Sequence, residues 1–209
     1  MIIDPNLEKI APWKMLTGPS IGGVTPTSFG MNYLDDATEF YTSGPAFADW
    51  LAAISRPVLP NSGKLSLLFT LRTDANAPNL AQALEFDTRL SIGGWNYNFS
   101  SQFNYAEGGM WQLALSGHWT DTGFKPGKFT PDVKYPLRID YAFDTTKQVG
   151  SVLGIHVGVK QFAVPAGMQN QPATDLKWAD GANLQCQLDL ASAGGAYSIY
   201  LSDVEYQWS

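Results

Sequence analysis

The sequence contains a single cysteine, Cys186, so no disulfide bond can form within the chain. Charged residues make up only 15% of its 209 residues, against about 25% in an average soluble domain. The formal net charge is −6, which argues against nucleic acid as a partner because phosphates require a Lys/Arg-rich surface. No apolar stretch approaches the roughly 20 residues of a membrane-spanning helix, so we expect no membrane insertion.

Helical periodicity is also nearly absent. Only Phe47, Trp50, Leu51 and Ile54 follow the i, i+3, i+4, i+7 spacing of an amphipathic helix, and prolines flank this segment on both sides. The spacing predicts one short helix there. No internal repeat of about 20 to 50 residues is present, which excludes propellers and solenoids.

Most of the remaining chain alternates apolar and polar residues with a period of two, the pattern of strands that bury one face. The apolar rows run over residues 65–71, 84–92, 97–105, 137–143, 153–159 and 184–190. The alternation changes parity near Ser202-Asp203, which predicts a β-bulge in the last strand. Many short strands separated by glycine turns indicate an all-β sandwich or barrel.

The organisation of the chain is simple. Residues 1–28 carry four prolines and three glycines, which predict an irregular N-terminal arm that packs on the domain through Trp13 and Leu16. Residues 29–209 contain no linker of low complexity and are expected to form a single β-sandwich domain.

Three segments resemble strands of one known superfamily: residues 83–90 (ALEFDTRL), residues 135–144 (YPLRIDYAFD) and residues 197–208. Together they make the region 29–209 similar to the concanavalin A-like lectin/glucanase superfamily. The resemblance implies an antiparallel two-sheet jelly-roll sandwich. It also implies that glycans would lie in the groove on the non-core face of the curved sheet.

The catalytic members of that superfamily carry a Glu-x-Asp-x-Glu or Glu-x-Asp-x-x-Glu strand. This chain has Glu85 and Asp87 in the matching positions, but Arg89 or Leu90 occupies the place of the last Glu. Retaining glycosidases need two carboxyl groups about 5 to 5.5 Å apart. Because the last Glu of the motif is replaced, one member of the catalytic pair is missing. We therefore expect no catalytic residues; in an enzyme of this fold the candidates would be Glu85 and Asp87.

The polar strand positions suit sugar hydroxyls, because amides both donate and accept hydrogen bonds. They are equally typical of a solvent-facing sheet. The expected ligand-binding residues are Glu85, Asp87, Arg89, Asn98, Gln102, Asn104, Arg138, Gln187 and Trp95. Trp111, Trp119 and Trp178 also sit beside glycine or polar turns, where an indole could stack on a pyranose ring.

Signals for metals are weak. Asp35-Asp36 and the Asp74/Asn76 pair offer oxygen ligands of the kind that Ca²⁺ prefers, but no motif has EF-hand spacing. No His/Cys cluster suggests zinc. The sequence therefore predicts no cofactor and no metal site. If a loop did bind a cation, its oxygen ligands would favour Ca²⁺.

The function that the sequence favours is a non-catalytic, lectin-like carbohydrate-binding domain whose partner is a carbohydrate or polysaccharide. A first alternative is a glycoside hydrolase or lyase of the same fold, and a second is a structural, self-assembling extracellular protein. High Gly, Trp, Tyr and Asn with little Lys favours an extracellular location. The start of the chain lacks the features of a signal peptide, which keeps a cytoplasmic location open.

Overall fold

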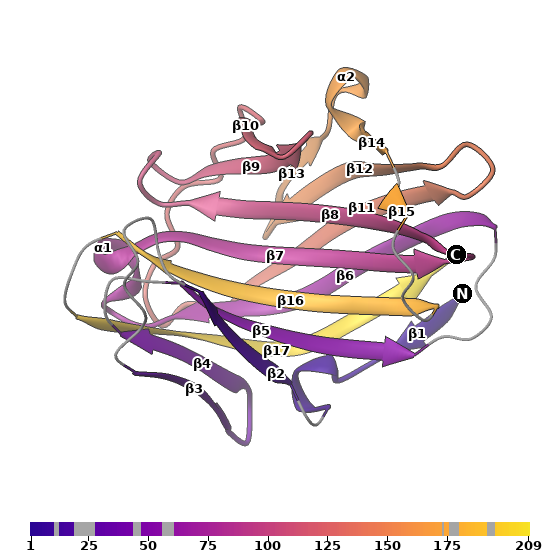
Figure 1. The fold of residues 1–209 in the computed structure, drawn as a ribbon. Coiled ribbons are helices and arrows are strands. Elements are labelled where there is room, and N and C mark those ends of the chain that lie inside the picture. The colour runs from indigo at the N-terminus through magenta and orange to yellow at the C-terminus, as the bar shows by residue number, and fades with distance from the viewer. Residues whose placement is uncertain are drawn as a thin grey trace.

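Two antiparallel sheets packed face to face form the protein (Figure 1). The computed structural model describes residues 1–10, 13–18, 28–43, 47–55, 61–172, 174–175, 180–191 and 195–209. Strands dominate these residues, and the arrangement is the two-sheet jelly-roll sandwich that the sequence predicts. Leu16 and Trp178 belong to predictions that the structure does not test: the side chain of Leu16 and the whole of Trp178 lie outside the described part.

The first sheet has nine strands, seven of them in the order β13-β12-β11-β6-β17-β4-β3. Their bounds are Lys160–Ala163 (β13), Val149–Val157 (β12), Tyr135–Asp144 (β11), Ser62–Thr73 (β6), Ala196–Trp208 (β17), Thr38–Ser43 (β4) and Ser28–Tyr33 (β3). Two short strands join it at the side: β1 (Ile2–Asp4) pairs with β17, and β14 (Asn170–Pro172) pairs with β12.

The second sheet has eight strands, seven of them in the order β10-β9-β8-β7-β16-β5-β2. Their bounds are His118–Asp121 (β10), Met110–Leu115 (β9), Trp95–Asn104 (β8), Ala81–Ile92 (β7), Gly181–Leu190 (β16), Phe47–Ser55 (β5) and Lys14–Gly18 (β2). The short strand β15 (Thr174–Asp175) pairs with β8.

The predicted helix over residues 47–54 is wrong. This segment is strand β5, which pairs along its whole length with β16 and over five residues with β2. Tertiary pairing thus overrides a local spacing that fits a helix by coincidence. The described helices lie elsewhere and are single turns: η1 (Leu7–Lys9), α1 (Ala77–Leu80) and α2 (Ala166–Gln169). None of them has the length and hydropathy to cross a membrane.

The N-terminal segment is more regular than its prolines suggest. It supplies a strand to each sheet, β1 beside β17 and β2 beside β5, where the sequence predicts an irregular arm. Trp13 packs on the sandwich as expected, because its indole is buried edge-on against Phe40 with ring centroids 5.1 Å apart.

The core lies between the sheets and contains most of the apolar residues that the alternation predicts; in the row 153–159, Leu153 and Val159 lie outside it. Aromatic side chains bridge the two layers: Phe99 on β8 stacks on Tyr141 on β11 at 4.8 Å, and Phe69 on β6 meets Phe86 on β7 at 4.6 Å. Cys186 is buried in the same core. Two polar outer faces remain, one on each sheet.

The β-bulge predicted near Ser202 is confirmed. The register between β17 and β6 shifts between Ser202 and Glu205, and Asp203 has a φ of 54°, in the left-handed region. The buried carboxylate of Glu8 accepts a hydrogen bond from the backbone N–H of Val204 at 2.9 Å. The bulge is therefore held by a side chain from the N-terminal segment.

Candidate functional site

The outer face of the eight-stranded sheet gathers most of the predicted site residues. Residues paired across an antiparallel sheet point to the same side, so one row runs from Asp121 through Gln112, Gln102 and Glu85 to Gln187. We call this surface the polar face. Its members are Glu85, Asp87, Arg89, Asn98, Ser100, Gln102, Asn104, Gln112, Trp119, Asp121, Asn183, Gln185, Gln187 and Asp189.

A chain of hydrogen bonds fixes the amides of the polar face. Gln112 Nε2 donates to Asp121 Oδ1 at 2.5 Å, and Gln112 Oε1 accepts from Gln102 at 2.5 Å and from Asn104 at 3.0 Å. Each amide is therefore held in one orientation. A surface whose donors and acceptors are already ordered loses less entropy when a ligand binds.

Two carboxyl groups meet beside this chain. Gln187 Nε2 donates to Glu85 Oε1 at 2.8 Å and to Asp189 Oδ1 at 3.1 Å, and Glu85 also forms a hydrogen bond with Asp189. Burial raises the pKa of Asp189, and the hydrogen bonds with Glu85 and Gln187 offset only part of this effect. A carboxyl–carboxylate hydrogen bond needs one proton, so the pair retains a proton to a higher pH than an isolated Asp.

Glu85 and Asp87 are buried, although they lie on the outer face of the sheet, where solvent-exposed side chains are expected. Glu85 is 8% exposed and Asp87 3% exposed. Asp87 accepts hydrogen bonds from the hydroxyl of Ser100 at 3.0 Å and from the backbone N–H of Ser101 at 3.2 Å. The expectation of a direct Asp87–ligand contact therefore loses support, and Asp87 acts first as a partner for neighbouring strands.

The accessible groups of the polar face lie around this buried centre. Asn98 is exposed, whereas Arg89, Asn104, Gln187 and Asp189 are half-buried. Arg89 stands between Asn98 and Asn183 in the register. Among the described residues none accepts a hydrogen bond from its buried Nε atom.

The tryptophans divide between the core and the polar face. Trp119 on β10 pairs with Ala114, on the side of Gln112 and Asp121, and is 39% exposed. The stacking role expected of Trp111 is wrong, because that indole is fully buried in the core. Trp95 does not join the polar face either: its parity places it with Tyr97, and it packs against the core.

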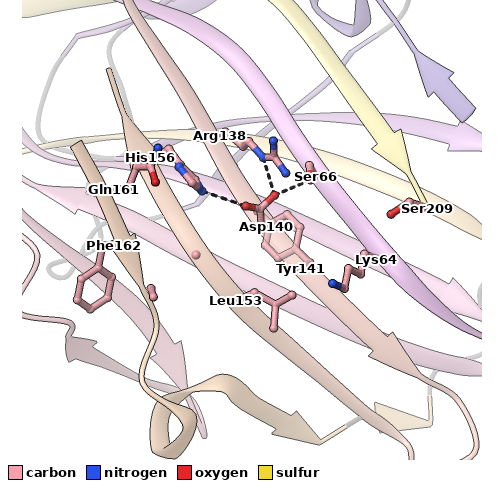
Figure 2. A pocket seen from close by; sticks show the side chains of 12 residues that line it. Lys64, Ser66, Arg138, Asp140, Tyr141, Leu153, His156, Gln161, Phe162 and Ser209 are labelled. Carbon is pink, nitrogen blue, oxygen red and sulfur yellow. Dashed lines mark hydrogen bonds and ion pairs between the residues drawn. The ribbon is translucent and has the colours of Figure 1, made fainter. Parts of the chain in front are cut away.

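Arg138, which the sequence places among the expected ligand-binding residues, does not share the polar face, because it lies on β11 in the other sheet. Its side chain instead lines a pocket of about 450 Å³ on the outer face of the nine-stranded sheet (Figure 2). We call this the Asp140 pocket. It is lined by Lys64, Ser66, Arg138, Asp140, Tyr141, Leu153, Gly154, His156, Gln161, Phe162, Ala163 and Ser209.

Asp140 is the centre of this pocket and receives three hydrogen bonds. Its Oδ1 accepts from Ser66 Oγ at 2.5 Å and from Arg138 Nε at 2.7 Å, while Oδ2 meets His156 Nε2 at 3.0 Å. Figure 2 shows the three groups converging on the carboxylate from β6, β11 and β12. Burial acts to raise the pKa of Asp140, but the hydrogen bonds from Ser66 and Arg138, the Arg138 charge and His156 outweigh it, so the pKa is lowered.

Replacing Asp140 with Asn is expected to lower the free energy of unfolding by about 1–2 kcal/mol at neutral pH, because charged hydrogen bonds are lost. A carboxyl group with a lowered folded-state pKa stabilises the protein above its unfolded-state pKa, and this stability is lost as the pH falls through the folded value. The gap between wild type and Asp140→Asn should therefore narrow when the pH is lowered from 7 to about 3, below the ordinary pKa of an Asp side chain. Urea unfolding at both pH values measures it; a gap that stays constant with pH would contradict this account.

A β-bulge shapes the pocket. The register between β11 and β12 shifts between Asp140 and Tyr141, so Val152 takes the core position and Leu153 turns outward into the pocket. Alternation with Ile155 and Val157 predicts a core position for Leu153. The prediction fails because no residue in the sequence marks the β-bulge. Asp140 itself had a signal: it alternates with Arg138 and stands opposite Ile139 and Tyr141.

The suggested calcium ligands are engaged in other contacts. Asp74 accepts hydrogen bonds from the backbone N–H groups of Asn76, Ala77 and Ser198, and Asp36 forms an ion pair with Lys134 at 3.2 Å. Within the described ranges no three or more His, Cys, Asp and Glu side chains are grouped to hold a metal ion.

Comparison with known proteins relates the chain to others through its fold. No protein-family model matches it, and no curated protein is similar to it in sequence. Similar solved structures include lectin I-B4 from Griffonia simplicifolia (TM-score 0.49, 8% identity, 100% of both chains covered) and alginate lyase AlyC3 (0.47, 9%, 90% of this chain and 81% of that one). Another is carbohydrate-binding module CBM66 from Bacillus subtilis (0.43, 8%, 88% and 94%). These are concanavalin A-like jelly-roll sandwiches, and the likeness concerns the fold alone.

Proposed function

We propose that the chain is a non-catalytic carbohydrate-binding domain that holds its glycan on the polar face. One observation carries the proposal: an exposed indole, Trp119, stands on the same sheet face as amides that are fixed by Gln112 and Asp121. A sugar ring has apolar faces and a polar rim. An aromatic ring beside ordered donors and acceptors matches both.

The accessible polar groups extend this surface across the sheet. Asn98 and Arg89 offer donors at one end, and Asn104 and Gln187 offer amides at the other. Such a spread suits an oligosaccharide or polysaccharide better than a single sugar unit. An extracellular location is part of the proposal, because polymeric glycans are abundant outside the cell.

Replacing Trp119 with Ala is expected to weaken glycan binding about tenfold or more, because aromatic anchors dominate binding energies. The fold should be unaffected, since the indole is exposed at the sheet edge. A glycan array followed by titration with the best glycan measures the effect. Tyr33→Ala is the matched control: it removes another exposed aromatic side chain, from edge strand β3 of the other sheet.

Equal losses in both variants, or a wild-type protein that retains no glycan on the array, would contradict the proposal. Binding lost only with Trp119→Ala would support it.

A second candidate function, polysaccharide degradation, is favoured by the carboxyl pair, because a carboxyl group with a raised pKa is a candidate general acid. Against it, Glu85 and Asp189 are in direct hydrogen-bond contact, closer than the spacing of either glycosidase class. A reducing-sugar assay on the bound glycans separates the two functions. Release of reducing ends that disappears in Glu85→Gln would favour the enzyme.

A further inference from the structure

We propose that the Asp140 pocket is a second binding site, for a small organic anion that carries a carboxylate or sulfate group on a ring. It is independent of the polar face, because it lies on the outer face of the other sheet. Its volume of about 450 Å³ falls within the range of small-molecule sites, about 300–1,000 Å³.

Arg138 provides the first anion-binding group. Among the described residues its side-chain hydrogen bond is made through Nε, to Asp140 Oδ1. A guanidinium has five N–H donors in a planar fork, so both terminal nitrogens stay available to an incoming oxyanion. The side chain is 47% exposed, which leaves this end open to the pocket.

Lys64 provides the second cation. It lines the same pocket from β6, and within the described part of the chain no carboxylate forms an ion pair with it. Figure 2 shows Asp140 between Lys64 and Arg138. The one side-chain carboxylate of the pocket, Asp140, is already paired with Arg138 and hydrogen-bonded to Ser66 and His156.

Among the side chains of the pocket the balance of charge is therefore positive, with two permanent cations, Lys64 and Arg138, against the carboxylate of Asp140. Ser209, which also lines the pocket, pairs its backbone with the backbone of Lys64. The protein as a whole carries a formal charge of −6, so this pocket stands apart from its surroundings. An acidic protein repels anions at long range, and only a local cluster of cations gives one a binding site. The charge of the ligand follows from this contrast.

The apolar wall of the pocket suggests the rest of the ligand. Phe162 on β13 lines the pocket and is stacked on Phe124 at 5.4 Å with the rings nearly parallel, which fixes its orientation. Leu153, turned outward by the bulge, adds a second apolar side chain. A ring would pack on these side chains while its anionic group meets Arg138 and Lys64.

The experiment titrates the intact chain with galacturonate, cyclohexanecarboxylate and galactose, followed by the backbone amide NMR signals of Gly154 and Gln161. Both acids are expected to shift these signals, and neutral galactose is not. Lys64→Gln combined with Arg138→Gln should weaken binding of the acids about tenfold or more, because charge-assisted hydrogen bonds are lost. Lys14→Gln removes an equal charge from an exposed position on β2 of the other sheet and should leave binding unchanged.

Binding of both acids supports a general organic-anion site, and binding of galacturonate alone supports an acidic saccharide as the source. Equal binding of galactose, no binding of either acid, or unchanged affinity in the double variant would each overturn the inference. Trp119→Ala separates the two proposals. Loss of galacturonate binding in that variant alone would place the acid on the polar face and leave the Asp140 pocket without its ligand.

Discussion

Replacing Phe99 with Ala is expected to lower the free energy of unfolding by about 3–5 kcal/mol, the range for large aromatic-to-alanine changes in a packed core. The ring is fully buried and stacks on Tyr141 across the two sheets. It also lies directly over Gly150 of β12: a Cβ atom on Gly150 would stand 2.6 Å from Phe99 Cε1. One side chain thus holds β8 against two strands of the opposite sheet.

Gly150→Ala supplies the test that is specific to this packing. Alone it should destabilise the protein, because the added methyl group overlaps the Phe99 ring. In the Phe99→Ala background the methyl group enters the vacated space, so its cost should fall or reverse sign. Urea unfolding of the two single variants and the double variant gives the coupling energy. Additive effects would show that the two residues do not compete for the same volume.

Replacing Glu8 with Ala is expected to cost about 3 kcal/mol. Its carboxylate is buried and accepts the N–H of Val204, immediately after the left-handed residue Asp203. Loss of a charged hydrogen bond costs about 1.5–3 kcal/mol, and an N–H left buried without a partner adds a desolvation penalty. The backbone oxygen of Glu8, which accepts from Thr38 Oγ1, remains in place in the variant.

Glu8→Gln is the matched control because it keeps an acceptor oxygen of nearly the same reach. It should cost about 1 kcal/mol, the difference between a charged and a neutral hydrogen bond. Chemical denaturation at neutral pH ranks the two variants. If Gln destabilises the protein as much as Ala does, the negative charge of Glu8 matters rather than its contact with the bulge.

The strands could be predicted from the sequence because alternation is a local property. The rows 65–71, 84–92, 97–105, 137–143 and 184–190 all place their apolar members in the core. The same signal was available for the tryptophans: Trp111 alternates with Leu113, and Trp119 alternates with Asp121. The N-terminal strands β1 and β2 could not be predicted, because each is short and pairs with a strand that is distant in the sequence.

The candidate sites could be predicted only in part. Parity shows that Glu85 and Arg138 both face outward, but a sandwich has two outer faces, and only strand order assigns each residue to a sheet. The contact of Glu85 with Asp189 depends on β16 lying beside β7, which no local pattern reveals. The Asp140 pocket depends in addition on a bulge that reverses the direction of Leu153.

The position of β17 has a consequence for the route by which the chain folds. This strand lies between β6 and β4 and also receives β1, so Trp208 pairs with Leu65 on one side and with Ile2 on the other. During synthesis, the edges of β4 and β6 that pair with β17 stay unpaired until residues 196–208 have left the ribosome. Pairings of such long sequence separation close slowly, typically in milliseconds to seconds. Until then the free edges of β4 and β6 are open to pairing with other chains, so aggregation of the incomplete chain is the main hazard of this strand order.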